Sequence, residues 1–119
     1  MIKYLDITPF PASVGVTTSE TDYIKEMKRL HIYDPPPFTN SGMDGSTNFF
    51  IHANNLYIIV TIKANNKTSK KQLIGLVVHE AVHVWQAVLE SIGEDNCGDE
   101  ITAYNIQNIV QFMLKELKI

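Results

Sequence analysis

The chain has 119 residues, enough for one domain with one modest hydrophobic core, so we expect a single domain over residues 1–119. The net charge of −3 creates no broad positive field, and we therefore expect no nucleic-acid partner. A single cysteine excludes an internal disulfide, and no apolar stretch resembles a signal peptide or a membrane span, which favours a soluble, cytoplasmic protein without a membrane partner.

The N-terminal region predicts little sheet and one helix. Residues 2–16 mix β-favouring residues with Pro9 and Pro11, so any strand there should be short or lie at a sheet edge. Ser19 begins a capping-box pattern, after which apolar residues recur at helical spacing. The pattern predicts a helix over about residues 20–31.

The middle of the chain favours a β-hairpin. Residues 48–53 and 56–63 are rich in aromatic and β-branched side chains. Asn54 and Asn55 lie between the two segments, and asparagine tolerates the left-handed backbone of a tight turn.

Two helices are expected in the C-terminal half. The first runs from about residue 69 to 92, with Thr68 as a plausible N-cap and Gly93 as its stop. The second runs from about residue 99 to 117. The predicted order is β-α-β-β-α-α, which is an α+β domain in which helices pack on a small sheet. The apolar side of the last helix comprises Ile106, Ile109, Val110, Met113, Leu114 and Leu117.

The helix predicted over residues 69–92 is apolar around almost its whole circumference, and its few polar residues form one narrow stripe. At about 100° per residue, His79, His83, Gln86 and Glu90 share one stripe, and Glu80 lies on its flank. A solvated surface helix would have a broad polar face. A narrow polar stripe on an apolar helix instead indicates a site.

Histidines four residues apart stack one turn apart on the same side of a helix, where both imidazoles can bind one ion. Glu80 lies about a quarter-turn away, close enough to reach a metal-bound water without being a ligand. Either histidine alone would more often be a satisfied core residue. Together, the three polar groups would be costly to bury unpaired, and a metal satisfies them jointly, so we expect Zn²⁺ bound by His79 and His83.

A catalytic zinc site needs a third protein ligand. Glu90 is nearly three turns from His79, and Glu94 lies in a turn where a ligand would be poorly held. Glu100, in the first turn of the last helix, is the favoured third ligand, with Asp99 in reserve. The opposing interpretation is that these two acidic residues only complement the helix dipole. The residues that share the face of Glu100, and which we expect to approach the preceding helix, are Ala103, Tyr104 and Gln107.

The pattern His79-Glu80-x-x-His83 followed by Glu100 resembles the gluzincin branch of the zincin metallopeptidases. The run from Glu100 to Asn105 is similar to the glutamate-helix motif of small phage and bacterial zincins, including the ImmA/IrrE-type peptidases that cleave repressors. The resemblance covers about residues 56–117 and implies a small zincin-like domain that hydrolyses a peptide bond in a specific protein substrate.

The resemblance also implies a mechanism. Zinc lowers the pKa of its bound water, Glu80 acts as the general base, and a nearby donor stabilises the oxyanion. Tyr104 is the first candidate for that donor, and His52 and Tyr57 are weaker ones. A peptide substrate would add as a strand along residues 56–63.

A second hypothesis is a binding or assembly module, of a kind that a phage could encode, in which zinc mainly joins two helices and proteolysis is weak or absent. Structural metals stabilise small folds, which favours this alternative. Glu80 favours the peptidase, because a purely structural site has no use for a general base beside its water. The sequence leaves the oligomeric state open.

Overall fold

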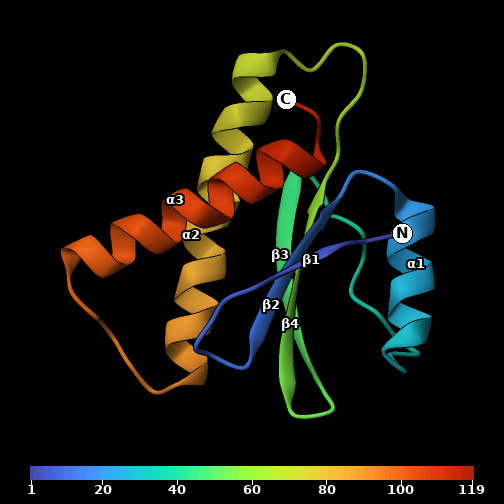
Figure 1. Cartoon of the computed structure of the whole chain (residues 1–119). Coiled ribbons are helices and arrows are strands. Elements are labelled where there is room, and N and C mark those ends of the chain that lie inside the picture. The colour runs from blue at the N-terminus through green and yellow to red at the C-terminus, as the bar shows by residue number, and fades with distance from the viewer.

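A four-stranded mixed sheet forms the centre of the computed structural model, which describes residues 1–119 (Figure 1). Helix α1 covers one face of the sheet, and α2 and α3 cover the other. The predicted α+β class is therefore confirmed. The elements in chain order are β1 (Tyr4–Asp6), β2 (Ala12–Thr17), α1 (Glu20–Arg29), β3 (Gly45–His52), β4 (Asn55–Ile62), α2 (Lys70–Ser91) and α3 (Asp99–Glu116).

The strand order is β1-β2-β4-β3, so β1 and β3 are the edge strands. Strand β2 runs parallel to β4, and the two outer pairs are antiparallel. The expectation of only a short or edge strand in residues 2–16 is right for β1 and wrong for β2, which is interior and buried along its whole length. Pro9 and Pro11 do not interrupt β2, because both lie in the connection before it begins.

The predicted hairpin is confirmed as β3 and β4, with a different turn. Its two central residues are Ala53 and Asn54, at φ 50° and 63°, and His52 pairs with Asn55 across the turn. Strand β3 begins at Gly45, three residues before the predicted start, because its first residues pair with the far end of β4. This extension brings the start of β3 to the side of α2.

The helix ends follow from capping. Ser19 caps α1 and accepts a hydrogen bond from the backbone of Asp22. The N-cap of α2 is Ser69 and not Thr68, because Ser69 and Gln72 form a reciprocal capping box. Gly93 follows the end of α2 at φ 73°, a left-handed conformation that glycine adopts at little cost.

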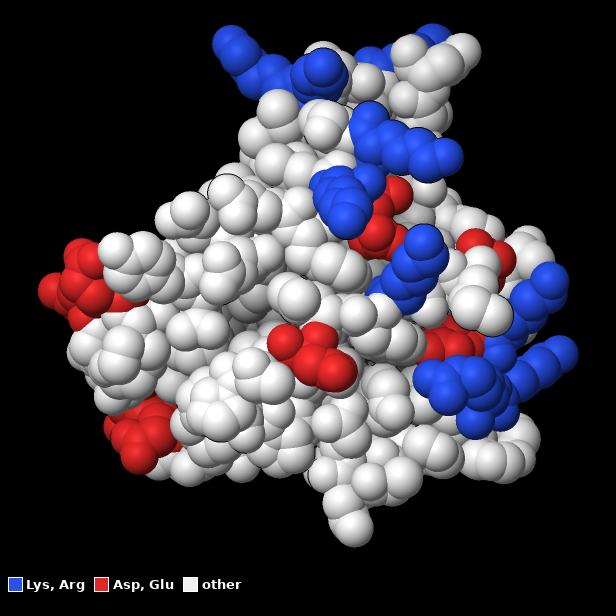
Figure 2. Space-filling model, in the orientation of Figure 1, with Lys and Arg blue, Asp and Glu red and all other residues white.

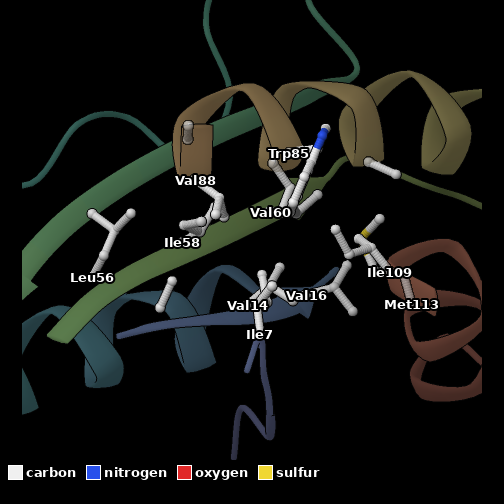
Figure 3. Packing of buried hydrophobic residues seen from close by; sticks show 14 of the residues in the cluster. Ile7, Val14, Val16, Leu56, Ile58, Val60, Trp85, Val88, Ile109 and Met113 are labelled. Carbon is white, nitrogen blue, oxygen red and sulfur yellow. The ribbon is translucent and has the colours of Figure 1, made fainter. Parts of the chain in front are cut away.

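The main core lies between the sheet and the pair α2 and α3 (Figure 3). Val14, Ile58 and Val60 project from the sheet towards Trp85 of α2 and Met113 of α3. All five side chains are almost completely buried. A smaller cluster attaches α1 to the opposite face of the sheet. The long helix α2 is thus held against the sheet along one side, which leaves its other side free to present a site.

Helix α2 is the one helix that is long and apolar enough to cross a membrane, judged by length and composition alone. Nearly half of its apolar segment is buried inside the domain, which is also how the core helix of a soluble protein behaves. The compact domain, with a radius of gyration of 13.8 Å, is consistent with a soluble protein.

Candidate metal centre

Helix α2 brings the imidazoles of His79 and His83 together on its solvent-facing side. Their Nε2 atoms lie 3.2 Å apart, and the ring planes are inclined by 73°. Both side chains are exposed, because the helix buries its opposite side against the sheet and α3. The one-turn spacing of the two residues produces this pairing locally, as predicted.

Gln86 orients the second histidine. Its Oε1 lies 2.9 Å from Nδ1 of His83, and an amide oxygen can only accept a hydrogen bond. The proton of His83 is therefore assigned to Nδ1, which leaves the lone pair on Nε2 directed towards His79. A partner on the other ring nitrogen is the usual arrangement for a metal-binding histidine.

Two histidine nitrogens that share one tetrahedral zinc at about 2.0–2.1 Å lie about 3.3 Å from each other. The observed 3.2 Å between the Nε2 atoms of His79 and His83 matches that separation. The same distance suits a direct hydrogen bond between the rings, which the pair makes without a metal. The two histidines therefore fit two positions of a zinc site without rearrangement.

Glu80 has a different environment from the neighbouring histidines. Only 3% of its surface is exposed, and Oγ1 of Thr47 donates a hydrogen bond of 2.5 Å to its Oε2. Gly45 lies against the same carboxylate, since a Cβ at this position would be 3.1 Å from Oε1. The carboxylate is thus enclosed between α2 and the first residues of β3.

Two hollows flank this carboxylate. One, of about 690 Å³, is bounded by the start of α2 and the segment before β3, and the charged residues Asp44, Lys63 and Lys67 line it. The other, of about 350 Å³, extends along the histidines towards Glu90 and Phe49. The residues common to both hollows are Met43, Gly45, His79 and Glu80. The polar groups predicted from the helix therefore lie at the middle of a continuous surface depression.

The expected third ligand does not join the histidines in this structure. Glu100 is exposed, and no group of three histidine, cysteine, aspartate or glutamate side chains is arranged to hold a metal ion. Thr102 is the residue of this turn that faces α2, through a 3.4 Å contact between its Oγ1 and Nε1 of Trp85. Glu100 precedes Thr102 by two residues, so it points about 200° away around the helix.

The face of α3 that carries Glu100 is its solvent side. Ala103 and Gln107 are exposed, and Tyr104 is 62% exposed. The expectation that this face approaches α2 is wrong, because Ile109 and Met113 fix the opposite side of the helix in the core. Tyr104 lines neither hollow.

No known protein family matches the chain. Comparison with curated proteins and with solved structures finds no match either. The function of the site is therefore argued from its own geometry.

The other two candidate donors lie away from the metal centre. His52 stacks against His31 beyond the end of α1, at a centroid distance of 5.7 Å. Tyr57 packs on the α1 side of the sheet, edge-on to Tyr4 and beneath the guanidinium of Arg29. Both positions agree with a packing role.

Sequence reasoning missed Thr47, Gly45 and Phe49. Thr47 and Phe49 alternate along β3, and they project to the α2 side of the sheet, where they line the smaller hollow. The signal that could have found them is this period-two alternation. It becomes visible only when β3 is extended back to Gly45.

Charge is distributed unevenly over the face of the molecule that Figure 2 shows. Figure 2 shows lysine and arginine side chains gathered near the start of α2 and over α1, and acidic side chains near the α2–α3 connection. The surface over the middle of α3 is uncharged, since α3 has no charged residue between Glu100 and Lys115. Among the residues that line the two hollows, Asp44, Lys63 and Lys67 lie at one end and Glu90 lies at the other.

Proposed function

We propose that the chain is a zinc-dependent peptidase of the gluzincin type, acting on a specific protein or peptide substrate in the cytoplasm. The observation that carries the proposal is the convergence of His79 and His83 beside the enclosed carboxylate of Glu80, within one surface depression. A convergent histidine pair next to a carboxylate that is not itself a ligand is the combination required for metal-assisted hydrolysis.

Each residue of the site has its own role in the proposed hydrolysis. His79 and His83 would hold the zinc, and Gln86 orients His83. Glu100 is the proposed third ligand, and because its side chain faces solvent in this structure, it would have to turn towards the histidines to bind the metal. A bound zinc ion would supply Lewis-acid polarisation of the substrate carbonyl and of an attacking water. Glu80 would take a proton from the water that adds to the carbonyl carbon, and would pass that proton to the leaving amine as the C–N bond breaks. One water is consumed, and a carboxylate and an amine are formed.

Strand β3 is the proposed docking edge for an extended substrate. Residues 56–63, expected to receive the added strand, cannot do so, because β4 is already paired with β2 on one side and β3 on the other. The outer edge of β3 is unpaired and begins beside Glu80. Met43 and Phe49 are about half exposed in the depression and would contact apolar substrate side chains.

The assembly module is the alternative function. It is favoured by the exposed apolar stripe of Ile74, Val78 and Val82, which follows one side of α2 next to the histidines. A metal bound by two surface histidines beside such a stripe could join two molecules without any hydrolysis. This alternative needs no general base, so it assigns no role to Glu80.

Glu80→Gln separates the two functions. The full chain is loaded with zinc, and cleavage of a diverse peptide library is followed by mass spectrometry, with bound metal measured on the same samples. The peptidase predicts that Glu80→Gln keeps its zinc and loses cleavage by about 100-fold or more. His83→Ala should lose the zinc and the cleavage together.

Zinc bound at one equivalent, with no peptide in the library cleaved, would overturn the peptidase in favour of the module. Absence of zinc binding after incubation with the metal would overturn both. Cleavage by wild-type protein that survives Glu80→Gln would contradict the assignment of Glu80 as the base.

A further inference from the structure

The hydrogen bond between Thr47 and Glu80 links the edge strand to the metal helix. Oγ1 of Thr47 lies 2.5 Å from Oε2 of Glu80, across 33 residues of sequence. The third residue of β3 therefore holds the side chain that α2 contributes as the proposed base. Glu80 makes no ion pair, since the two salt bridges of the chain involve Asp22 and Glu26.

The two oxygens of the Glu80 carboxylate are not equivalent. Oε2 accepts the hydrogen bond from Thr47, whereas Oε1 has no hydrogen-bond partner in the protein. No buried side-chain oxygen in the chain lacks a partner, so Oε1 keeps access to solvent although the residue as a whole is buried. Oε1 is also the oxygen nearest to Gly45, on the side of the depression.

A general base needs one oxygen free to take a proton and a side chain that does not rotate away from the reacting atoms. A glutamate side chain has three rotatable bonds, so a hydrogen bond to one carboxylate oxygen is needed to restrict its rotation. Thr47 donates that hydrogen bond, and because its side chain is β-branched, rotation about its own χ1 is also restricted. Gly45 provides the space in which the free oxygen lies.

We infer that Thr47 is a positioning residue, whose hydroxyl fixes Oε2 of Glu80 so that Oε1 faces the depression as the proton-accepting oxygen; this inference rests on the proposed peptidase function. Substrate added along the outer edge of β3 would lie on the same strand that holds the base. Strand β3 thus sets the position of the base relative to the substrate.

The positioning is tested first in the metal-free protein, where no activity is needed. The side-chain carboxyl resonance of Glu80 is observed by NMR on protein labelled with ¹³C-glutamate and is assigned by its loss in Glu80→Gln. Thr47→Val removes the hydroxyl at nearly constant shape and should shift the resonance. Thr47→Ser keeps a hydroxyl and should return it close to the wild-type position.

Thr61→Val is the matched control. It removes a threonine hydroxyl from the neighbouring strand β4, where Thr61 donates to the carbonyl oxygen of Phe38 on the other face of the sheet. This variant should be destabilised to a similar or greater extent without moving the Glu80 resonance. An unchanged resonance in folded Thr47→Val, or an equal shift in Thr61→Val, overturns the positioning role.

The activity measurement separates this inference from the peptidase itself. On a cleaved peptide, Thr47→Val should lower kcat by about 10- to 100-fold with little change in KM, and Thr47→Ser should recover most of the loss. If Thr47→Val retains full kcat while Glu80→Gln is inactive, the peptidase stands and the positioning is overturned. If the resonance responds as expected but no variant or wild type cleaves any peptide, the carboxylate is positioned and the peptidase function fails.

Discussion

Gln86 and His83 are joined by a 2.9 Å hydrogen bond between Oε1 and Nδ1, one turn along the exposed side of α2. The bond fixes the ring of His83 and assigns its proton to Nδ1 before any metal arrives. The hydrogen bond to Gln86 thus preorganises His83 for metal binding, because zinc would bind through the lone pair on Nε2.

Replacing Gln86 with leucine should lower zinc affinity by about 10-fold, since the ring of His83 loses its orienting partner. Gln86→Glu keeps an acceptor oxygen in reach of Nδ1, so this variant should retain or increase the affinity. Zinc titration against a competing chelator measures both. Gln107→Leu, at an exposed position on α3, is the control and should leave the affinity unchanged. Equal affinities in wild type and Gln86→Leu would contradict the orienting role.

Glu100→Gln tests the third ligand. If Glu100 completes the site, neutralising it should lower zinc affinity by about 10-fold or more, because a protein ligand is lost. Glu100 is exposed in the structure, so the substitution should leave folding intact, as circular dichroism would verify. Glu20→Gln removes a charge from an exposed position in the first turn of α1, away from the site, and serves as the control. An affinity that follows wild type in Glu100→Gln assigns the third position to another group.

The local parts of the site could be predicted from the sequence, because they depend on a single helix. Two histidines four residues apart on α2 must lie on one side of it, and the glutamate between them must lie on the flank. The position of Glu100 could not be predicted in this way. The rotation of α3 is set by long-range packing of Trp85, Ile109 and Met113, and this packing turns Glu100 towards solvent.

The fold, like the site, could be predicted only in its local parts. The helices and the hairpin follow from periodicity, but β2 is buried on both faces and has no alternation to reveal it. The parallel pairing of β2 with β4 makes β4 an interior strand, which transfers the free edge to β3. The alternation along β3 places Thr47 and Phe49 on one face of the strand, but only this long-range arrangement places that face beside α2.

Gly45→Ala should impair activity more than stability. The added Cβ would lie 3.1 Å from Oε1 of Glu80, closer than an ordinary contact, so the carboxylate must move. Gly45 has no positive φ, and alanine suits a strand better than glycine, which offsets part of the crowding. We expect kcat to fall by about 10-fold or more. The unfolding free energy should change by less than about 1 kcal/mol.

Gly75→Ala is the comparison for the stability measurement. Apart from the adjacent residues and the backbone of the helix itself, no atom lies within 4 Å of a Cβ at Gly75, and the residue is in the interior of α2. Alanine there should raise the unfolding free energy by about 0.5–1 kcal/mol, measured by urea denaturation. A large loss of stability in Gly45→Ala would show that the crowding is not relieved by movement of Glu80.

The Tyr4–Glu26–Arg29 cluster on the α1 side of the sheet should make stability depend on pH. Burial alone would raise the pKa of the Glu26 carboxyl, but hydrogen bonds from Arg29 and Tyr4 and the charge of Arg29 outweigh it and hold the pKa below its usual range. A carboxyl whose pKa is lower in the folded state stabilises the fold above its unfolded pKa of about 4.3. That contribution is lost as the pH falls through the folded-state pKa.

Glu26→Gln tests this dependence by urea denaturation at pH values from about 6 down to about 3, a range that spans the unfolded pKa of glutamate. Wild type should lose unfolding free energy over this range, and Glu26→Gln should lose less because it no longer takes up that proton. At pH 7 the variant should be less stable by about 1–3 kcal/mol, since the charged partner of Arg29 is gone. Glu94→Gln, in the exposed α2–α3 connection, should follow wild type. Parallel pH profiles for wild type and Glu26→Gln would show that the carboxyl of Glu26 titrates alike in the folded and unfolded chain.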